Sequence, residues 1–331
     1  MALKPPYLLF LGDAPDALAA KVAQGIKDWR PENVVGQISL PGCQADLGLE
    51  ELSLAEARAR GAQTLVVGVA NRGGVISESW LAVLSAALEE GMDLAAGLHN
   101  RLADAPGLSE AAARLGRALH DVRVPQGPFK VGDGAKRPGK RMLPVGTDCS
   151  CGKMYTALAL EAGMRKRGWA ADFRATGQTG ILITGDGAPV DAVVSDFIAG
   201  AIEALAPAAA PDHWDLIEGQ GALHHPSFAG VTAGLIHGAQ PDALVLCHEP
   251  TRTHMRGLPH YPLPDLGEAM DLALRFAQRT NPAAAFVGLS INTAKLEEPA
   301  AMALLEELSQ RFSLPAVDPV RTGVDAIIDA L

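Results

Sequence analysis

The sequence predicts an α/β protein that folds into two parallel-sheet domains, and three observations lead to this prediction. The chain has 331 residues, which suggests two domains at about 150 residues each. Hydrophobic residues make up 48% of the chain and charged residues 20%, an ordinary globular composition that excludes a disordered chain. Short apolar runs alternate with helical patterns along the sequence, which is typical of βαβ units.

The first 125 residues contain four short apolar runs, each followed by a helical pattern. The expected strands cover residues 7–11, 33–38, 64–69 and 93–98. The expected helices lie near residues 15–29, 54–60, 78–90 and 109–119. This alternation predicts a Rossmann-like domain over residues 1–125. No G-x-G-x-x-G motif follows its first strand, so we assign it no dinucleotide.

Residues 126–140 (QGPFKVGDGAKRPGK) are rich in Gly, Pro and Lys and carry no hydrophobic period, so we expect a linker there. The alternation then restarts and defines a second domain over residues 141–331. Its expected strands cover residues 141–145, 170–175, 214–217, 243–247, 285–289 and 314–317, with a further short strand at 181–184. Its expected helices cover residues 152–168, 190–205, 230–238, 265–278 and 297–311, with a last helix that ends at 331.

The strongest motif is a glycine-rich loop between the first strand and the first helix of the second domain. This phosphate loop consists of Gly146, Thr147, Asp148, Cys149, Ser150, Cys151, Gly152, Lys153, Met154, Tyr155 and Thr156. Glycines let a backbone wrap closely around phosphate oxygens, and the N-terminus of the following helix adds a partial positive charge. Lys153 adds a full charge. Together these features favour phosphate binding over an ordinary βα turn, and they predict a P-loop NTPase-like domain.

Two features of the phosphate loop differ from the common P-loop. Five residues separate Gly146 from Gly152 instead of four, and this longer form, beginning Gly-Thr-Asp, resembles the loop of dethiobiotin synthetase. Met154 stands where a Mg²⁺-binding Ser or Thr is expected. A thioether is a poor ligand for Mg²⁺. We therefore expect phosphate binding, while Met154 argues against Mg²⁺-dependent hydrolysis of a nucleotide.

A second signature, WDLIEGQGALHHP, follows the strand at 214–217. The carboxylate of Glu218 should face the same crevice as the phosphate loop, because ligands bind at the carboxyl ends of parallel strands. Glu218 could take a proton from an amine, hold a metal or orient a lysine, or it could merely cap the next turn. His224 and His225 follow in the same loop, and we expect His224 as a further base and His225 against the substrate, although histidine pairs in loops are often only exposed.

Other polar residues follow the neighbouring strands and should reach the same edge of the sheet. Gln178 lies in the segment TGQTG, and Arg174 ends the strand before it. Arg252 and Arg256 follow the strand at 243–247. Guanidinium groups bind carboxylates and phosphates in a fork, so we expect these arginines to grip a substrate, unless each forms a surface salt bridge. Arg72, beside two glycines of the first domain, could reach across for the same purpose.

Charge and cysteine content exclude several classes of protein. The formal net charge is −10 and aromatic residues make up 5%, which argues against nucleic-acid binding. The acidity is uneven, since residues 130–174 hold 10 Lys+Arg and 4 Asp+Glu, a local charge of +6. No apolar stretch approaches the roughly 18 residues that span a bilayer, and no signal peptide is evident. Four cysteines in 331 residues do not make a disulfide framework. Cys149 and Cys151 form a C-x-C pair, but no second pair at metal spacing accompanies it, so we expect a cytoplasmic protein without a metal.

The motifs together resemble one family over nearly the whole chain. GTDCSCGKMYT, TGQTGI, WDLIEGQGALHHP, GVTAGLIHGAQPDALVLCHEPTR and GLSINTA occur in this order, and VANRGGVISESW and GLHNRL precede them. They are similar to the P-loop D-glutamate N-acetyltransferases, long described as a domain of unknown function. The resemblance implies a Rossmann-like domain joined to a P-loop domain, with acetyl transfer from acetyl-CoA to the amine of D-glutamate. It also implies a pathway partner similar to dipeptide epimerases.

The resemblance suggests direct acyl transfer to a small-molecule substrate. Glu218, His224 or His225 would deprotonate the amine, and Lys153 would hold phosphates of coenzyme A or the developing oxyanion. A variant route would carry the acetyl group on a loop cysteine, Cys149 or Cys151. An ATP-dependent ligase or carboxylase resembling dethiobiotin synthetase, or a non-catalytic nucleotide or coenzyme A sensor, are the alternatives. We also expect a homo-oligomer, because apolar helices cover two α/β domains.

Overall fold

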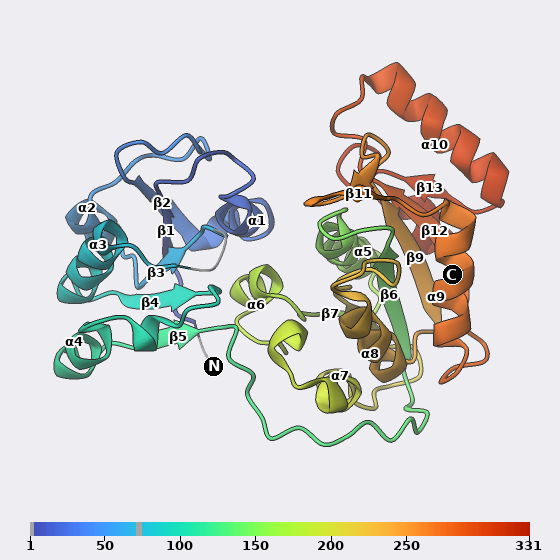
Figure 1. Ribbon diagram of the computed structural model, residues 1–331, viewed down its shortest axis with the longest axis horizontal. Helices are drawn as coiled ribbons and strands as arrows, with labels where there is room; N and C mark the ends of the chain where they lie inside the picture. The colour runs from blue at the N-terminus through green and yellow to red at the C-terminus, as the bar shows by residue number, and fades with distance from the viewer. Residues whose placement is uncertain (1–2, 71–74) are drawn as a thin grey trace. The chain divides into compact units, whose positions relative to one another are not determined.

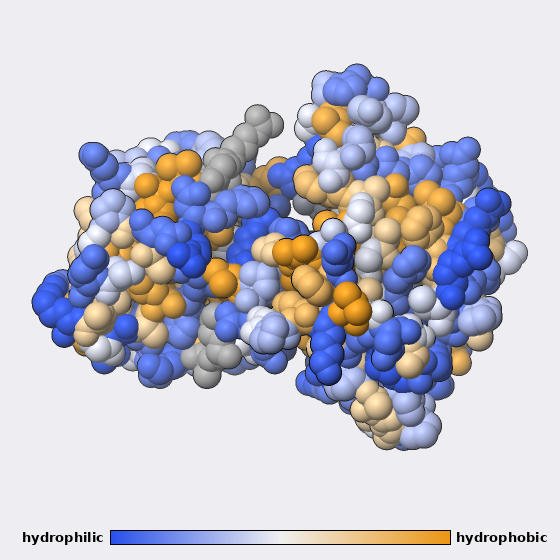
Figure 2. Space-filling model, turned by 60° about the horizontal axis from the view of Figure 1, so that its bottom comes forward, coloured by the Kyte–Doolittle hydropathy of each residue, from blue (hydrophilic) through white to orange (hydrophobic). Residues whose placement is uncertain are grey.

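The computed structural model describes residues 3–70 and 75–331 and divides the chain into two compact units. The first unit comprises residues 1–125 and 177–189, and the second comprises residues 126–176 and 190–331. None of the helices in the described part of the chain is long and apolar enough to cross a membrane. The face shown in Figure 2 is mostly hydrophilic with hydrophobic groups between, as on ordinary globular surfaces.

A five-stranded parallel sheet forms the centre of the first unit, in the order β2-β1-β3-β4-β5 (Figure 1). Its strands are β1 (Tyr7–Gly12), β2 (Val34–Ser39), β3 (Thr64–Val67), β4 (Asp93–Ala96) and β5 (Leu119–Asp121). Leu8 pairs with Leu65 and Leu9 with Val66, and all four side chains are fully buried. Such continuous apolar runs are typical of parallel strands covered on both faces. The predicted Rossmann-like domain is confirmed.

The helices of the first unit begin and end at local signals. They are α1 (Lys21–Trp29), α2 (Leu54–Ala59), α3 (Glu78–Glu89) and α4 (Leu108–Leu115), with 3-10 turns at Pro31–Asn33 and Leu102–Asp104. Ser53 caps α2 through a reciprocal pair with Glu56, and Ser77 caps α3. The prediction of a helix over 109–119 was wrong at its end, because Gly116 adopts a left-handed conformation that stops α4. Strand β5, which the sequence analysis did not predict, starts three residues later.

One helix of the first unit comes from the second half of the sequence. Residues Gln178–Thr184 form α6, so the short strand predicted at 181–184 was wrong. The run Ile-Leu-Ile-Thr is rich in β-branched residues and has strand propensity, but α6 packs against α1 and buries Ile181 and Leu182. Tertiary packing therefore overrides the local preference.

The second unit contains a six-stranded parallel sheet in the order β13-β12-β9-β6-β8-β7 (Figure 1). Its strands are β6 (Lys140–Gly146), β7 (Ala171–Arg174), β8 (Trp214–Ile217), β9 (Ala243–His248), β12 (Ala285–Ile291) and β13 (Ala316–Val317). Its helices are α5 (Lys153–Lys166), α7 (Ile198–Leu205), α8 (Ala229–Ala239), α9 (Leu266–Ala277), α10 (Glu298–Phe312) and α11 (Asp325–Asp329). Strands β8 and β9 flank β6, so the turns that follow all three strands meet at one edge of the sheet.

Two local elements of the second unit differ from the prediction. The helix predicted over 190–205 begins as 3-10 turns at Val190–Ala192 and Ser195–Phe197 before α7. A two-stranded antiparallel hairpin, β10 (His254–Met255) and β11 (Leu258–Pro262), was not predicted. Prolines within β11 hide it in the sequence, because proline is depleted in strands.

The stretch from 126 to 139 packs along the second unit. The backbone N–H groups of Asp133 and Gly134 donate to the carboxylate of Glu203, at 3.1 and 3.0 Å. The guanidinium of Arg137 donates to the carbonyl oxygens of Ala206 and Gly238, at 2.9 and 2.7 Å. These bonds attach the segment to the ends of α7 and α8.

Candidate functional site

The phosphate loop joins β6 to the 14-residue helix α5 at the carboxyl edge of the second sheet. Gly152 adopts a φ of +109° and Ser150 a φ of +52°, so two residues leave the ordinary helical and extended regions. A left-handed serine costs about 1–2 kcal/mol, and such residues cluster at functional sites. Within the described residues, the backbone N–H groups of Ser150, Gly152 and Lys153 have no hydrogen-bond acceptor. These groups could bind an anion, as at other helix N-termini.

Lys153 and Cys151 fill the interior of the phosphate loop. The buried Lys153 Nζ donates to the carbonyl oxygen of Asp148 at 2.7 Å and lies 3.6 Å from Cys151 Sγ. A Cβ atom at Gly146 would stand 2.6 Å from Cys151 Sγ and 2.9 Å from Lys153 Nζ. Glycine at 146 is therefore a steric requirement for this arrangement.

Thr156 lies beneath the loop. Its hydroxyl oxygen lies 2.7 Å from Ser290 Oγ and donates to the carbonyl oxygen of Gly152 at 3.0 Å. It also lies 3.4 Å from Cys247 Sγ, and burial raises the pKa of Cys247 to about 12. Thr156 therefore ties α5 to β9 and β12, and it does not substitute for the missing hydroxyl at Met154.

Arg252 holds the phosphate loop from outside. Its guanidinium donates to Asp148 Oδ2 at 2.5 Å, to the carbonyl oxygen of Cys149 at 2.7 Å and to that of Ser150 at 3.3 Å. It also bonds to Glu249. Burial disfavours the charge of Arg252, but the hydrogen bond to Asp148 and the neighbouring Glu249 raise its pKa on balance. Sequence reasoning expected Arg252 to grip the substrate and missed these contacts, which only the tertiary structure reveals.

The remaining contacts of this cluster complete a group of alternating charges. Lys295 Nζ donates to Glu249 Oε1 at 2.7 Å. Burial would raise the pKa of Glu249, but the hydrogen bond from Lys295 and the charge of Arg252 lower it on balance. The exposed Arg256 donates its backbone N–H to Asp148 Oδ2 and its guanidinium to Ser150 Oγ, at 2.8 and 2.7 Å. The hairpin segment is thereby attached to the loop.

Glu218 follows β8 and is buried, with 3% of its surface exposed. Its Oε2 accepts the backbone N–H of Thr176 at 2.9 Å, and its carbonyl oxygen accepts the Thr176 hydroxyl at 2.5 Å. A Cβ atom at the next residue, Gly219, would stand 1.9 Å from the carbonyl oxygen of Pro144 and 2.9 Å from Lys153 Cδ. The glycine therefore lets this turn pack directly under the stem of Lys153. Glu218 and Lys153 belong to the same edge of the sheet, as the sequence predicted.

The structure brings His225 close to the phosphate loop. Asp148, Cys149 and His225 each place one potential metal-binding atom of the side chain in the same small volume. These three atoms lie within 4.8 Å of one another. His225 is buried, accepts the backbone N–H of Ser227 at its Nδ1 at 3.1 Å, and stacks on Phe228. The carboxylate of Asp148 already accepts bonds from Arg252 and two backbone N–H groups, so it is a poor metal ligand. His224 is half-buried.

Other predicted residues lie elsewhere. Arg174 Nε donates to the buried Asp215 at 2.7 Å, and Arg174 Nη2 lies 3.5 Å from Asp172, so this guanidinium is engaged within the sheet. Gln178 begins α6 in the first unit, where its side chain lies against Gly97. Arg72 lies outside the described residues.

His248 ends β9 beside the phosphate loop. Sequence reasoning placed the segment from His248 to Arg252 at the carboxyl edge of the sheet but gave His248 no role of its own. Its Nδ1 lies 2.9 Å from Thr147 Oγ1. Burial, followed by the charge of Arg252, lowers its pKa. A neutral ring therefore hydrogen-bonds the first turn of the loop. Its place directly after the apolar run 243–247 was the signal that the sequence offered.

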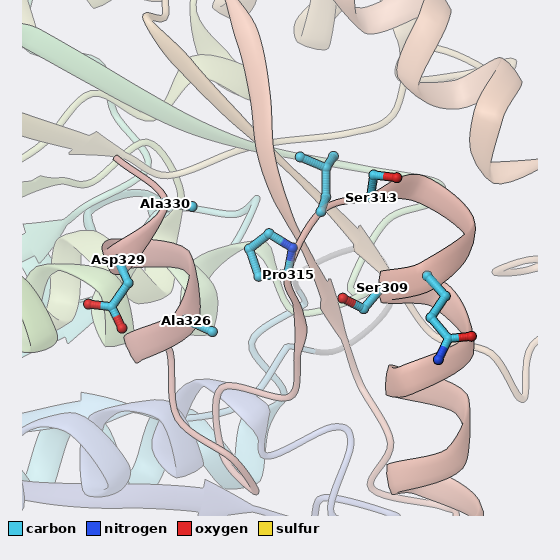
Figure 3. A pocket seen from close by; sticks show the side chains of 8 residues that line it. Ser309, Ser313, Pro315, Ala326, Asp329 and Ala330 are labelled. Carbon is cyan, nitrogen blue, oxygen red and sulfur yellow. The ribbon is translucent and has the colours of Figure 1, made fainter.

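A surface pocket of about 490 Å³ lies in the second unit, and Figure 3 shows the side chains that line it. It is bordered by the end of α10, by α11 and by Pro315, which precedes β13. It therefore opens at the amino end of a parallel strand, opposite to the phosphate loop. The charged residue of its lining, Asp329, pairs with Arg167 at 2.6 Å.

Comparisons with known proteins cover both halves of the chain. Residues 130–328 match the P-loop domain of unknown function DUF1611_C, and residues 38–125 match the Rossmann-like domain DUF1611_N. The chain is 64% identical to a D-glutamate N-acetyltransferase of Tritonibacter scottomollicae and 50% identical to one of a Pseudoalteromonas species, each over 99% of both chains. A crystal structure of a DUF1611 family protein from Anabaena variabilis has 34% identity and a TM-score of 0.89 over 99% of both chains.

Proposed function

The chain belongs to the DUF1611 family, and from this premise we propose that it is a D-glutamate N-acetyltransferase. It transfers an acetyl group to the amine of D-glutamate and forms N-acetyl-D-glutamate. The observation that carries the proposal is identity of 64% and 50%, over essentially full length, to two proteins with this activity in their names. The fold prediction, a Rossmann-like domain followed by a P-loop domain, is confirmed.

We propose acetyl-CoA as the acyl donor. Coenzyme A carries a pyrophosphate and a 3′-phosphate, and the phosphate loop offers unpartnered N–H groups at the start of α5 together with Lys153. The surrounding stretch, residues 130–174, has a local charge of +6. No phosphoryl group is transferred in this reaction. Met154 in place of a Mg²⁺-binding hydroxyl is therefore no handicap.

The acceptor amine must lose a proton before it attacks the thioester. Glu218 is the proposed base, because it is a buried carboxylate in the turn that packs under Lys153. His225, which lies beside the loop, and His224 are the other candidates. Lys153 and the loop N–H groups hold the phosphates of the donor or the oxyanion of the tetrahedral intermediate.

The carboxylates of D-glutamate need cationic partners. Arg256 is exposed at the rim of the phosphate loop and is the best-placed guanidinium of the described chain for this role. The substrate-binding roles of Arg174, Gln178, Arg252 and Arg72 stay predictions. A route through an acetylated cysteine is less favourable, because burial raises the pKa of Cys149 and Cys151 is 1% exposed. We therefore propose direct transfer.

The test is release of free coenzyme A by the purified protein. We expect release with acetyl-CoA and D-glutamate, no requirement for ATP or Mg²⁺, and competition between pyrophosphate and acetyl-CoA. L-glutamate serves as the matched control for stereospecificity. Phosphate release that depends on ATP, Mg²⁺ and a small acid would instead indicate a ligase. Tight coenzyme A binding without turnover of any amine would indicate a sensor.

Three predictions about the wider context stay predictions. They are a homo-oligomeric state, a cytoplasmic location and a pathway partner similar to dipeptide epimerases. Such a partner would consume N-acetyl-D-glutamate. Its reaction in a coupled assay with the product of this protein would support the third prediction.

A further inference from the structure

The phosphate loop depends on a conformation that its own residues do not favour. Ser150 adopts a left-handed φ of +52°, a region that non-glycine residues seldom occupy. A loop binds an anion when successive N–H groups point inward, and the corresponding carbonyl oxygens must then point outward and find other partners. The outward carbonyls of Cys149 and Ser150 both accept bonds from one side chain, that of Arg252.

Arg252 is suited to this task by its chemistry and its own restraints. Its five N–H donors form a rigid fork, and the fork reaches Asp148 Oδ2 in addition to the two carbonyls. The side chain is 16% exposed, and the carboxylates of Asp148 and Glu249 on either side are 1% and 10% exposed. Arg252 and Lys295 thus face the carboxylates of Asp148 and Glu249, and charge-assisted bonds fix the geometry of the cluster.

We propose that Arg252 is a positioning residue: it holds the phosphate loop in its anion-binding conformation and does not itself bind D-glutamate. This inference rests on the proposed function, in which the loop binds the phosphates of acetyl-CoA. Arg256 supports the same conformation through Ser150 Oγ and remains exposed. The two arginines that the sequence placed side by side as clamps therefore have different tasks.

The test separates the Michaelis constants of the two substrates. In Arg252→Lys the charge stays, but one ammonium cannot reach all of the acceptors that the fork reaches. We expect KM for acetyl-CoA to rise by about 10- to 100-fold, because small displacements of binding groups have effects of this size. KM for D-glutamate should stay unchanged. Arg167→Lys is the matched control, since Arg167 follows the other end of α5 and bridges two carboxylates, and it should change neither constant.

Three outcomes would overturn the proposal. A rise confined to KM for D-glutamate would make Arg252 a substrate clamp. Unchanged KM values would show that Arg252 is not needed for the anion-binding conformation of the loop. An equal rise of the KM values for acetyl-CoA and D-glutamate would show that its effect is not specific to the loop. Arg252→Ala tests the fork further: added ethylguanidinium should restore binding of acetyl-CoA, and failure of any rescue in a folded protein would contradict the proposal.

A second measurement does not depend on turnover. We expect inorganic pyrophosphate to raise the thermal unfolding midpoint of the wild-type protein and of Arg167→Lys, and to raise that of Arg252→Lys much less. Equal protection of all three proteins would overturn the proposal. If the wild-type protein released no coenzyme A but showed this pattern, the proposed acetyltransferase function would fail while the role of Arg252 in the loop would stand.

Discussion

The first βα turn of each unit offers a comparison of two sites with the same topology. In the first unit β1 ends at Gly12 and Asp13 follows; in the second unit β6 ends at Gly146 and the phosphate loop follows. Both strands lie inside parallel sheets, with neighbours on each side. Crevices at such positions commonly bind nucleotides or other phosphates. The two turns nevertheless differ in what fills them.

An aromatic side chain closes the turn in the first unit. A Cβ atom at Gly12 would stand 2.6 Å from the ring of Trp80, which is 2% exposed and packs edge-on against Phe10 at 5.4 Å. The indole N–H of Trp80 donates to Asp13 Oδ1 at 2.8 Å. The space over this strand end thus holds an indole and a carboxylate, and neither favours an anion.

In the second unit, the equivalent space is lined by backbone N–H groups and by the side chains of Lys153 and Cys151. Gly219 admits the next turn under Lys153, and Gly152 opens the helix. The difference teaches that a parallel sheet provides a place for a ligand, while the side chains that reach that place decide whether a ligand can enter. Three predictions follow from this contrast between packing in one turn and binding in the other.

The largest expected effect is a loss of stability when Trp80, which covers the turn after β1, is replaced. Trp80→Ala should lower the free energy of unfolding by about 3–5 kcal/mol, because it removes a buried aromatic group and leaves a cavity. Denaturant titration measures the loss. Trp80→Phe, which keeps most of the ring volume, should lose much less. If Trp80→Ala instead raised KM for acetyl-CoA without lowering the free energy of unfolding, the turn after β1 would be part of the binding site. The proposed difference between the two turns would then be wrong.

The second effect concerns binding in the open turn. Lys153→Met keeps the aliphatic stem and removes the charge, and kcat/KM for acetyl-CoA should fall by about 10²- to 10³-fold, the loss seen when one preorganised electrostatic contact is removed. Steady-state kinetics measure it. Lys140→Met is the control, since Lys140 is exposed and its ammonium lies over Trp214. Equal losses in both variants would mean that the charge acts only at long range.

The smallest expected effect is a pH dependence of stability, to which one histidine of each unit contributes. Burial lowers the pKa of His120 on β5 and of His248 beside the loop from the ordinary value of 6.5. Each histidine has a lower pKa in the folded protein than in the unfolded chain. Its contribution to the free energy of unfolding is therefore fully present above about pH 6.5. The contribution decreases as the pH falls, because the unfolded chain then binds a proton before the folded protein does. We therefore expect the free energy of unfolding to decrease between pH 7 and pH 5.

Single variants assign this acid sensitivity to one unit or the other. His120→Asn and His248→Asn should each lack their share of the decrease, as followed by denaturant titration at several pH values. If neither variant altered the pH dependence, the two rings would not be responsible for it.

The sequence predicted those features that depend on local spacing. Gly146, Gly152 and Lys153 lie between a strand and a helix, and this pattern is sufficient to place the phosphate loop. Glu218 follows a strand, and parallel topology brings it to the same edge. The order of the strands and the flanking of β6 by β8 and β9 depend on pairing between distant segments, which no local pattern reveals.

The missed features have physical causes of the same kind. Strand β5 is only three residues long, and a left-handed Gly116 separates it from α4. Helix α6 has strand-like composition and depends on packing against α1. The contacts of Arg252 join residues about 100 positions apart in the chain. Such contacts exist only after folding.

The placement of α6 has a consequence for how the two halves can be separated. The chain passes from one unit to the other at residues 125–126, 176–177 and 189–190, so three covalent connections join them. A fragment that ends at residue 125 lacks the helix that packs against α1, and a fragment that starts at residue 126 carries this helix without its partner. Cutting the polypeptide once therefore yields no pair of intact halves, and an exchange of α6 between two copies of the chain would interlock them.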